Sequence, residues 1–214
     1  MRTVWEINGG KKLLLIFSGW AMDEHPTSII ETQGADVCTC FDYQSLETSD
    51  LDRWAQYSEI NLIAWSTGVW AAEQVLGNSH IKLSHAIAVN GTPTTVHDET
   101  GIPKAIFQAT YDNLNSISLA KFTRRMLGSS EAFNAFKSIE PKRDLENQKQ
   151  ELGTILEVKF EETQTGLIRW DKAIIGTKDA IFPPSNQRNY WEGKTEIEEI
   201  EAGHFIFYNY LFTF

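Results

Sequence analysis

Residues 60–76 of the chain read INLIAWSTGVWAAEQVL. The run from Ile60 to Trp65 is short and mostly apolar, which indicates a buried strand, and Gly68 to Leu76 contains good helix formers. Gly77 follows at the position where a helix is commonly capped. A strand, a tight turn and a helix therefore meet at Ser66, and a serine in such a turn has its hydroxyl pushed out at the edge of the sheet.

Other apolar runs have the character of strands. Leu13 to Phe17 is apolar at every position, as expected of a strand that helices cover on both faces. Further runs are Asp36 to Phe41, His85 to Val89 and Ala173 to Ile175, with helical stretches between several of them. This alternation predicts an α/β fold with a mostly parallel central sheet and right-handed crossovers.

The N-terminus predicts a hairpin that leads into this sheet. Thr3 to Asn8 alternates between apolar and polar residues, and Gly9-Gly10 supplies a turn before the strand at Leu13. A chain of 214 residues is long enough for one well-packed domain. We therefore expect a single domain over residues 1–214.

Strand signals disappear between Gly101 and about Thr165, where the pattern becomes helical. Two faces of one predicted helix can be distinguished: Leu119, Phe122 and Met126 share one face, and Arg124 and Arg125 point away from it. We expect a helical cap over about 101–165, inserted between core segments 1–100 and 166–214.

Charge and cysteine usage exclude several classes of protein. The formal net charge is −10 and the pI is about 5.0, which disfavours binding to nucleic acid. The longest apolar run has five residues, against about 20 for a membrane span, so no membrane association is expected. Cys38 and Cys40 are expected to be buried thiols that bind no metal and form no disulfide framework, which suits the cytoplasm.

A serine needs a base and an orienting carboxylate to act as a nucleophile. Asp179 follows the predicted strand Lys172 to Gly176, and His204 follows a predicted strand at about Thr195 to Ile200. A short helix, Ser185 to Trp191, separates the two. Both residues then emerge at one edge of a parallel sheet, in the order Ser, acid, His of the α/β-hydrolases. We predict that Ser66, Asp179 and His204 form a catalytic triad.

Competing residues have weaker positions. The other histidines lie in loops or flank a turn: His25, His80, His85 and His97. Asp98 follows another strand and is the alternative acid, whereas Asp171 precedes its strand and falls at the wrong edge. An ordinary buried serine in a strand-to-helix turn remains the structural alternative for Ser66.

An oxyanion intermediate needs two backbone N–H donors. Thr67 follows the predicted nucleophile and supplies the first. Trp20 follows the strand Leu13 to Phe17, with Gly19 letting the backbone turn inward, and supplies the second. The alternative for Trp20 is core packing, and its indole can also wall an acyl pocket.

Several motifs together resemble a known family. They are Phe17-Ser-Gly-Trp-Ala-Met-Asp23, Ala64-Trp-Ser-Thr-Gly-Val-Trp70, Val89-Asn-Gly-Thr-Pro93 with Gly101-Ile-Pro103, Lys121-Phe-Thr-Arg-Arg-Met126, Gly176-Thr-Lys-Asp-Ala-Ile-Phe-Pro183 and Gly203-His204. In this combination, which spans nearly the whole chain, the sequence resembles the BioG-type pimeloyl-carrier-protein methyl ester esterases. The resemblance implies an α/β-hydrolase of biotin synthesis that releases methanol from the pimeloyl methyl ester and needs no cofactor or metal. It also implies Ser66 as nucleophile, Asp179 as acid and His204 as base.

The resemblance further implies acyl carrier protein as the partner that brings the substrate. Lys104 to Arg143 holds seven basic residues against three acidic ones, which is a local balance of +4 opposite in sign to the acidic carrier. Arg124 and Arg125 are the expected contacts, the alternative being a solvated helix face. The alternative functions are a broad short-acyl esterase or thioesterase and a non-catalytic binding module for acyl carriers. A monomer is favoured, and the tail Phe205 to Phe214 is expected to form a final helix against the core.

Overall fold

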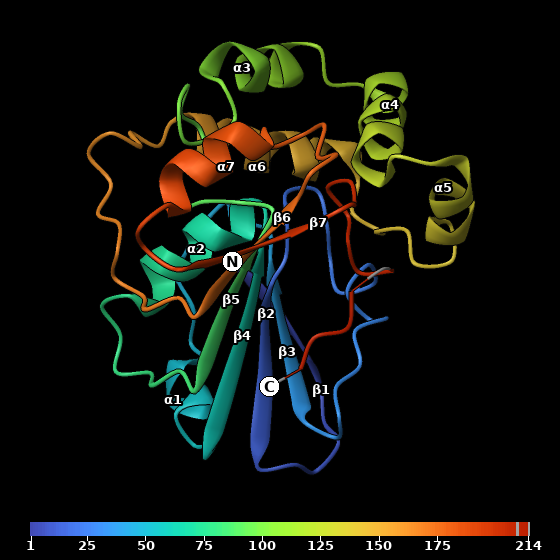
Figure 1. Ribbon diagram of the computed structural model, residues 1–214. Helices are drawn as coiled ribbons and strands as arrows, with labels where there is room; N and C mark the ends of the chain where they lie inside the picture. Colours follow the sequence, from blue (N-terminus) through green and yellow to red (C-terminus); the bar gives the residue numbers. More distant parts are fainter. Residues whose placement is uncertain (209, 214) are drawn as a thin grey trace.

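The structure, a computed structural model, describes residues 1–208 and 210–213. A seven-stranded sheet within these residues has the order β1-β3-β2-β4-β5-β6-β7 (Figure 1). The strands are β1 (Arg2–Glu6), β2 (Lys12–Phe17), β3 (Asp36–Phe41), β4 (Glu59–Trp65), β5 (His85–Val89), β6 (Lys172–Gly176) and β7 (Glu196–Ile200). Neighbouring strands are parallel except for β1 and β3, which are antiparallel. The predicted mostly parallel sheet is confirmed.

The helices within the same residues lie between these strands in the chain. They are α1 (Leu51–Trp54), α2 (Thr67–Leu76), α3 (Lys104–Asp112), α4 (Ser116–Leu127), α5 (Ser130–Phe136), α6 (Leu145–Leu156) and α7 (Pro184–Trp191). Figure 1 shows α3, α4 and α5 beyond the upper end of the sheet, where the central parallel strands finish. α3 to α6 fall within the segment for which we predicted a cap. In the described part of the chain, no helix combines the length and apolar character that a membrane span needs.

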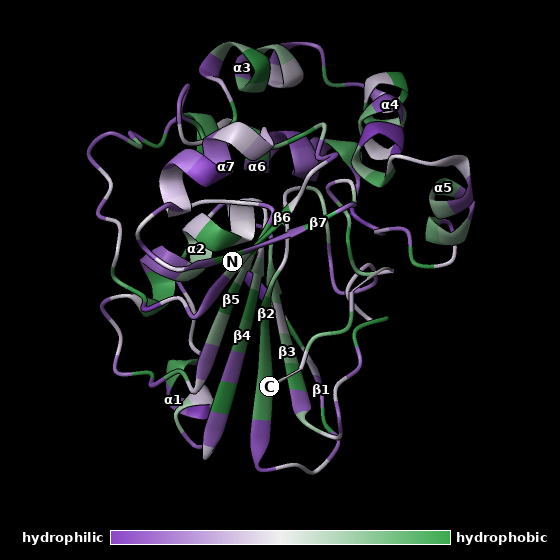
Figure 2. Ribbon diagram, in the orientation of Figure 1, coloured by the Kyte–Doolittle hydropathy of each residue, from purple (hydrophilic) through white to green (hydrophobic). Residues whose placement is uncertain are grey.

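The central strands of the sheet are buried. β2 lies between β3 and β4, and each of its residues after Lys12 is buried. Figure 2 shows β2 hydrophobic over most of its length, whereas α4 is banded with hydrophilic residues. This is the pattern of a strand inside a layered sheet and of a helix with one solvent-facing side.

The predicted N-terminal hairpin is wrong, because β1 pairs with β3 and not with β2. The register runs from Arg2 opposite Phe41 to Glu6 opposite Val37. β3 and β4 already occupy both edges of β2, so β1 is added at the free edge of β3. The Gly9-Gly10 turn does form, and the carboxylate of Asp36 fixes it by accepting hydrogen bonds from the N–H groups of Asn8 and Gly10 at 2.7 and 3.1 Å.

The predicted final helix does not form in residues 205–208 and 210–213; its other members, Asn209 and Phe214, lie outside the described residues. Phe205 and Phe207 both pack edge-on against Trp65, with ring centroids 5.5 and 5.3 Å away. Residues two apart contact the same neighbour in an extended chain, whereas a helix turns them to different sides. Phe205, Phe207 and Phe212 are nevertheless buried, whereas Tyr208 is exposed, so the expected packing against the core holds for these phenylalanines and the helical conformation was wrong.

Candidate active site

Ser66 lies in the turn between β4 and α2, with φ 57° and ψ −124°. This region of positive φ is costly for a residue with a side chain and persists only where the surroundings impose it. Here the surroundings are close: a Cβ on Gly68 would lie 2.2 Å from the carbonyl oxygen of Phe17, and one on Gly91 would lie 2.4 Å from that of Ser66. Glycine is required at both positions because β2, α2 and the chain after β5 approach the turn directly.

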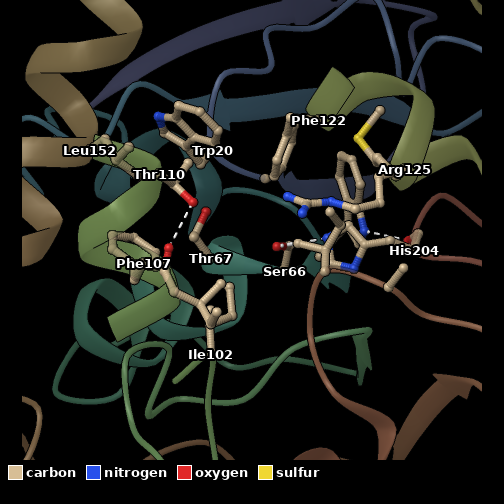
Figure 3. A pocket seen from close by; sticks show the side chains of 16 residues that line it. Trp20, Ser66, Thr67, Ile102, Phe107, Thr110, Phe122, Arg125, Leu152 and His204 are labelled. Carbon is tan, nitrogen blue, oxygen red and sulfur yellow. Dashed lines mark hydrogen bonds between the residues drawn. The ribbon is translucent and has the colours of Figure 1, made fainter. Parts of the chain in front are cut away.

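The three residues of the predicted triad come together at the carboxyl ends of β4, β6 and β7. His204 Nε2 lies 2.9 Å from Ser66 Oγ, and His204 Nδ1 lies 2.7 Å from Asp179 Oδ2. All three side chains are buried. Figure 3 shows Ser66 and His204 facing each other at one side of a pocket. With Nδ1 donating to Asp179, Nε2 is free to accept the proton of the Ser66 hydroxyl.

The carboxylate of Asp179 is held by hydrogen bonds from the loop that follows β6. Its Oδ1 accepts the N–H groups of Ile181 and Phe182 at 2.8 and 2.9 Å. Its Oδ2 accepts the Gln187 side-chain amide at 3.2 Å in addition to His204. Because both oxygens have defined donors, the carboxylate holds the imidazole in one orientation.

Asn90, which our sequence reasoning did not select as a site residue, anchors the loop that carries His204. Its Nδ2 donates to the carbonyl oxygens of Gly203 and His204 at 3.1 and 2.8 Å, and its Oδ1 accepts the N–H of Gly176 at 2.7 Å. Trp65 Nε1 also donates to the His204 carbonyl, at 3.0 Å. The available signal was the position of Asn90 directly after β5, at the same edge as the predicted triad.

Trp20 and Thr67, the predicted oxyanion donors, both line the pocket beside Ser66. Trp20 lies in the β2 loop, which we define as residues 18–23. Its indole N–H donates to the carbonyl of Gln148 at 2.8 Å, and its ring packs edge-on against Phe122 with centroids 5.0 Å apart. The side chain of Trp20 thus walls the pocket that also contains Ser66.

The pocket is narrow, with a cavity of about 50 Å³, and mostly apolar (Figure 3). Its apolar wall comes largely from α3, α4, α6 and the loop after β6: Ile102, Ile106, Phe107, Phe122, Met126, Leu152, Ala180 and Ile181. Arg125 lines this pocket too, although we expected it to point away; its guanidinium lies 5.9 Å from the centre of the Phe122 ring. Arg124 is exposed and lines a separate hollow with Lys137.

The competing residues lie elsewhere. His25 contacts Asp23, His80 and His85 are exposed, and the His97 ring accepts backbone N–H groups in its own loop. Asp98, the alternative acid, is exposed and accepts the N–H of Lys104 at 2.9 Å. Of the histidines considered, His204 is the one that lines the pocket with Ser66.

One group of side chains has the composition of a metal site. The ligating atoms of Asp23, Glu24 and His25 lie within 4.8 Å of one another. Asp23 Oδ2 already accepts the N–H of Lys142 at 2.7 Å, and Oδ1 contacts both the backbone and the ring of His25. Through these hydrogen bonds, Asp23 anchors the β2 loop to the segment before α6. We therefore assign no metal to this group.

Comparison with known proteins identifies a family. The family model described as pimeloyl-ACP methyl esterase BioG matches residues 1–213. A malonyl-[acyl-carrier protein] O-methyltransferase of Bacteroides fragilis is 44% identical over 196 residues, which are 91% of this chain and 40% of that protein. An uncharacterised protein of Haemophilus influenzae is 37% identical over 97% of this chain and 94% of its own length. The chain thus spans less than half of the Bacteroides relative and nearly all of the Haemophilus one.

Solved structures agree with the fold. The crystal structure of BioG from Haemophilus influenzae superposes with a TM-score of 0.89 at 36% identity and covers 98% of this chain and 96% of that one. An esterase from Exiguobacterium antarcticum superposes with a TM-score of 0.74 at 16% identity, covering 96% and 89% of the two chains. The second similarity concerns the α/β-hydrolase fold alone.

Proposed function

Because this chain belongs to the BioG family of pimeloyl-ACP methyl esterases, we propose that it hydrolyses the methyl ester of pimeloyl-acyl carrier protein, as a carboxylic ester hydrolase of biotin synthesis. One observation supports serine catalysis above the others: Ser66 Oγ, His204 and Asp179 are connected by contacts of 2.9 and 2.7 Å beneath an apolar pocket. The two buried free cysteines suit the reducing cytoplasm in which we place the enzyme. We retain the division into a core and a helical cap over about 101–165 as part of the proposal.

In the first half of the proposed reaction, Ser66 Oγ attacks the ester carbonyl carbon while His204 Nε2 takes the hydroxyl proton. The carbonyl π electrons move to the oxygen, and the N–H groups of Trp20 and Thr67 stabilise the resulting oxyanion. When the intermediate collapses, the bond to the methoxy group breaks. His204 returns its proton to that oxygen, and methanol leaves with an acyl-enzyme behind it.

In the second half, a water molecule attacks the same acyl carbon, and His204 Nε2 accepts one of its protons. Collapse of the second oxyanion breaks the bond to Ser66 Oγ, which regains a proton from His204. The products are the free pimeloyl carboxyl group on its carrier and the restored serine. Asp179 stabilises the imidazolium in both halves without becoming protonated itself.

The pocket supports an extended, unbranched acyl chain as the substrate. Its narrow cavity and apolar wall offer few polar partners to a substituted chain, and the apolar side chains come from the helices that overlie Ser66. The methyl ester reacts at Ser66, so the carrier end of the chain must lie toward the surface. We propose that the helices α3 and α4 guide the chain outward.

Part of the basic excess in Lys104 to Arg143 is not available to a carrier protein. Arg143 is buried and pairs with Asp42 and Glu151, and Lys104 pairs with Glu161. The cations of α4, Lys121, Arg124 and Arg125, remain exposed, and Arg125 lines the pocket. We therefore propose that the acidic carrier docks on α4, with Arg124 and Arg125 among its contacts.

Charge reversal at these arginines tests the docking proposal. In Arg124→Glu with Arg125→Glu, we expect KM for the carrier-bound ester to rise about fivefold to tenfold, which is the order of one or two exposed ion pairs. The salt dependence of that KM should weaken, because fewer opposite charges meet. Arg124→Glu alone should leave hydrolysis of a small aryl ester unchanged, since its side chain lies outside the pocket.

A matched control is Lys11→Glu with Lys82→Glu, which makes the same change of charge at the opposite edge of the sheet, before β2 and β5. This variant should keep the parent KM for the carrier-bound ester. Equal losses in both double variants, or an equal loss on the aryl ester in Arg124→Glu, would contradict docking on α4.

Substrate comparison tests the proposed function. We expect methanol release from methyl pimeloyl-acyl carrier protein with a kcat/KM at least about 100-fold above that for a simple aryl ester or for the thioester to the carrier. The aryl ester lacks the remote binding energy of the carrier, and the thioester carbonyl lies at the carrier end of the chain, away from Ser66. Equal rates on all three would favour the broad esterase or thioesterase. No turnover of any of them, with retained affinity for the acyl carrier, would favour the non-catalytic binding module.

A further inference from the structure

The β2 loop, residues 18–23, contacts α6 and the segment just before it at five points, one of which is the Lys142 N–H that donates to Asp23 Oδ2. Trp20 Nε1 donates to the Gln148 carbonyl at 2.8 Å, and the Ala21 N–H donates to the Glu151 carboxylate at 3.3 Å. Gln148 Nε2 donates to the Ala21 carbonyl at 3.4 Å, and Arg143 Nη1 donates to the Met22 carbonyl at 3.0 Å. The part of the chain that carries the proposed oxyanion donor is thus attached to a helix more than 120 residues later.

Ala21 needs such attachment. Its φ is 67°, in the left-handed region that residues with a Cβ rarely adopt. Asp42, in the loop after β3, has φ 60° and also lies against this part of the molecule. Two loops, one with Ala21 and one with Asp42, therefore hold unfavourable backbone conformations next to the side chains of Arg143 and Glu151. A strained backbone conformation of this kind persists only where several surrounding contacts hold it in place.

The pair consists of Arg143 and Glu151, whose side chains are 2% and 0% exposed. Arg143 Nη1 lies 2.7 Å from Glu151 Oε2, and Nη2 lies 3.2 Å from Asp42 Oδ1. Glu151 Oε1 accepts the N–H of Tyr43 at 2.9 Å. Burial raises the pKa of the Glu151 carboxyl, and the Arg143 guanidinium opposes that rise. One ion pair therefore supplies a hydrogen-bond partner to both loops.

We propose that Arg143 and Glu151 are positioning residues that hold the backbone of the β2 loop in the geometry in which the Trp20 N–H reaches the oxyanion. The inference rests on the proposed function, because it assigns a role in stabilising an oxyanion formed at Ser66. Trp20 is the residue next to Ala21, so rotation of the backbone at Ala21 redirects the neighbouring peptide groups. The pair acts through that loop and touches no substrate.

Glu151→Gln is the variant that tests this. A glutamine side chain has one acceptor oxygen in place of two. Because Glu151 Oε2 accepts both the Ala21 N–H and the Arg143 guanidinium, the amide oxygen is expected to stay there, so that the NH₂ group faces the Tyr43 N–H and the charge that holds Arg143 is lost. We expect kcat on a small aryl ester to fall about 10- to 100-fold with KM changed less than about twofold, since a misplaced oxyanion donor acts on the transition state. Affinity for an alkyl trifluoromethyl ketone, which forms an oxyanion adduct with Ser66 Oγ, should fall by the same factor.

The chain offers a closely matched control in Glu73→Gln. Glu73 is also 0% exposed, and its carboxylate accepts the N–H of Leu167 and of Ile168 and the indole N–H of Trp170. It holds the segment before β6, away from the pocket. Glu73→Gln should lower Tm by an amount similar to Glu151→Gln and leave kcat and the ketone affinity unchanged. This comparison separates loss of stability from loss of loop geometry.

Arg143→Lys provides a second variant if Glu151→Gln does not fold. Lysine keeps the charge beside Glu151 but lacks the planar fork that reaches the Met22 carbonyl and Asp42 together. A smaller fall in kcat at constant KM is expected. Parent values of kcat and ketone affinity in folded Glu151→Gln or Arg143→Lys would overturn the inference. Absence of esterase activity and of ketone binding in the parent protein would instead overturn the proposed function.

Discussion

Ser66→Ala is expected to lower kcat for methanol release from the carrier-bound methyl ester by about 10⁵- to 10⁶-fold, with little change in KM. The substitution removes the atom that would form the acyl-enzyme. The remaining N–H donors and the pocket still bind the ester and polarise its carbonyl, which leaves a small residual rate through direct attack by water. Ala at this position keeps the same strained backbone, so the fold should be retained. Methanol release and a mass increase of the trapped acyl-enzyme in the parent protein provide the two measurements.

Ser18→Ala is the matched control for this experiment. Ser18 is a fully buried serine at the carboxyl end of β2, and its hydroxyl has no hydrogen-bond partner among the residues that the structure describes. Removing that hydroxyl should leave kcat within about twofold of the parent, because it breaks no contact. A Ser66→Ala protein as active as Ser18→Ala would remove serine catalysis from the proposal.

The sequence was sufficient for the elements that place the candidate site. Leu13 to Phe17 is apolar on both faces, and Ile60 to Trp65 is so except at Asn61, which is the pattern of a strand inside a layered sheet. Once the strands before Ser66, Asp179 and His204 are identified as parallel, their carboxyl ends must share an edge. The convergence of these three residues therefore depends on local patterns plus one general rule of topology.

The features that were missed depend on contacts without a local pattern. The partner of β1 is decided by which strand edge remains free, and no property of Thr3 to Asn8 itself reports that. In the sequence, nothing distinguishes Arg143 and Glu151 from solvent-exposed charged residues of a helical segment. In the fold, both side chains are buried under loops that lie more than 100 residues earlier in the chain. Asn90 similarly becomes informative only when the loop of His204 is known to lie against it.

The second large effect is expected in Asp179→Asn, which should lower kcat by about 10⁴-fold while retaining the fold. The hydrogen bonds around Asp179 dictate how asparagine must sit. Oδ1 accepts two backbone N–H groups, from Ile181 and Phe182, so the amide oxygen is expected to stay there. The amide nitrogen then faces His204 Nδ1, 2.7 Å away in the parent. Two donors cannot meet at that distance, so Nδ1 must become the acceptor and Nε2 must carry the proton.

This exchange of tautomers removes the base, because a protonated Nε2 donates to Ser66 Oγ in place of accepting from it. KM should change little, since Asp179 does not line the pocket. Asp98→Asn and Asp171→Asn alter carboxylates that each accept one backbone N–H at the surface, and they should retain parent activity. An Asp179→Asn protein with parent kcat, or an Asp98→Asn protein with the large loss, would show that a different carboxylate orients His204.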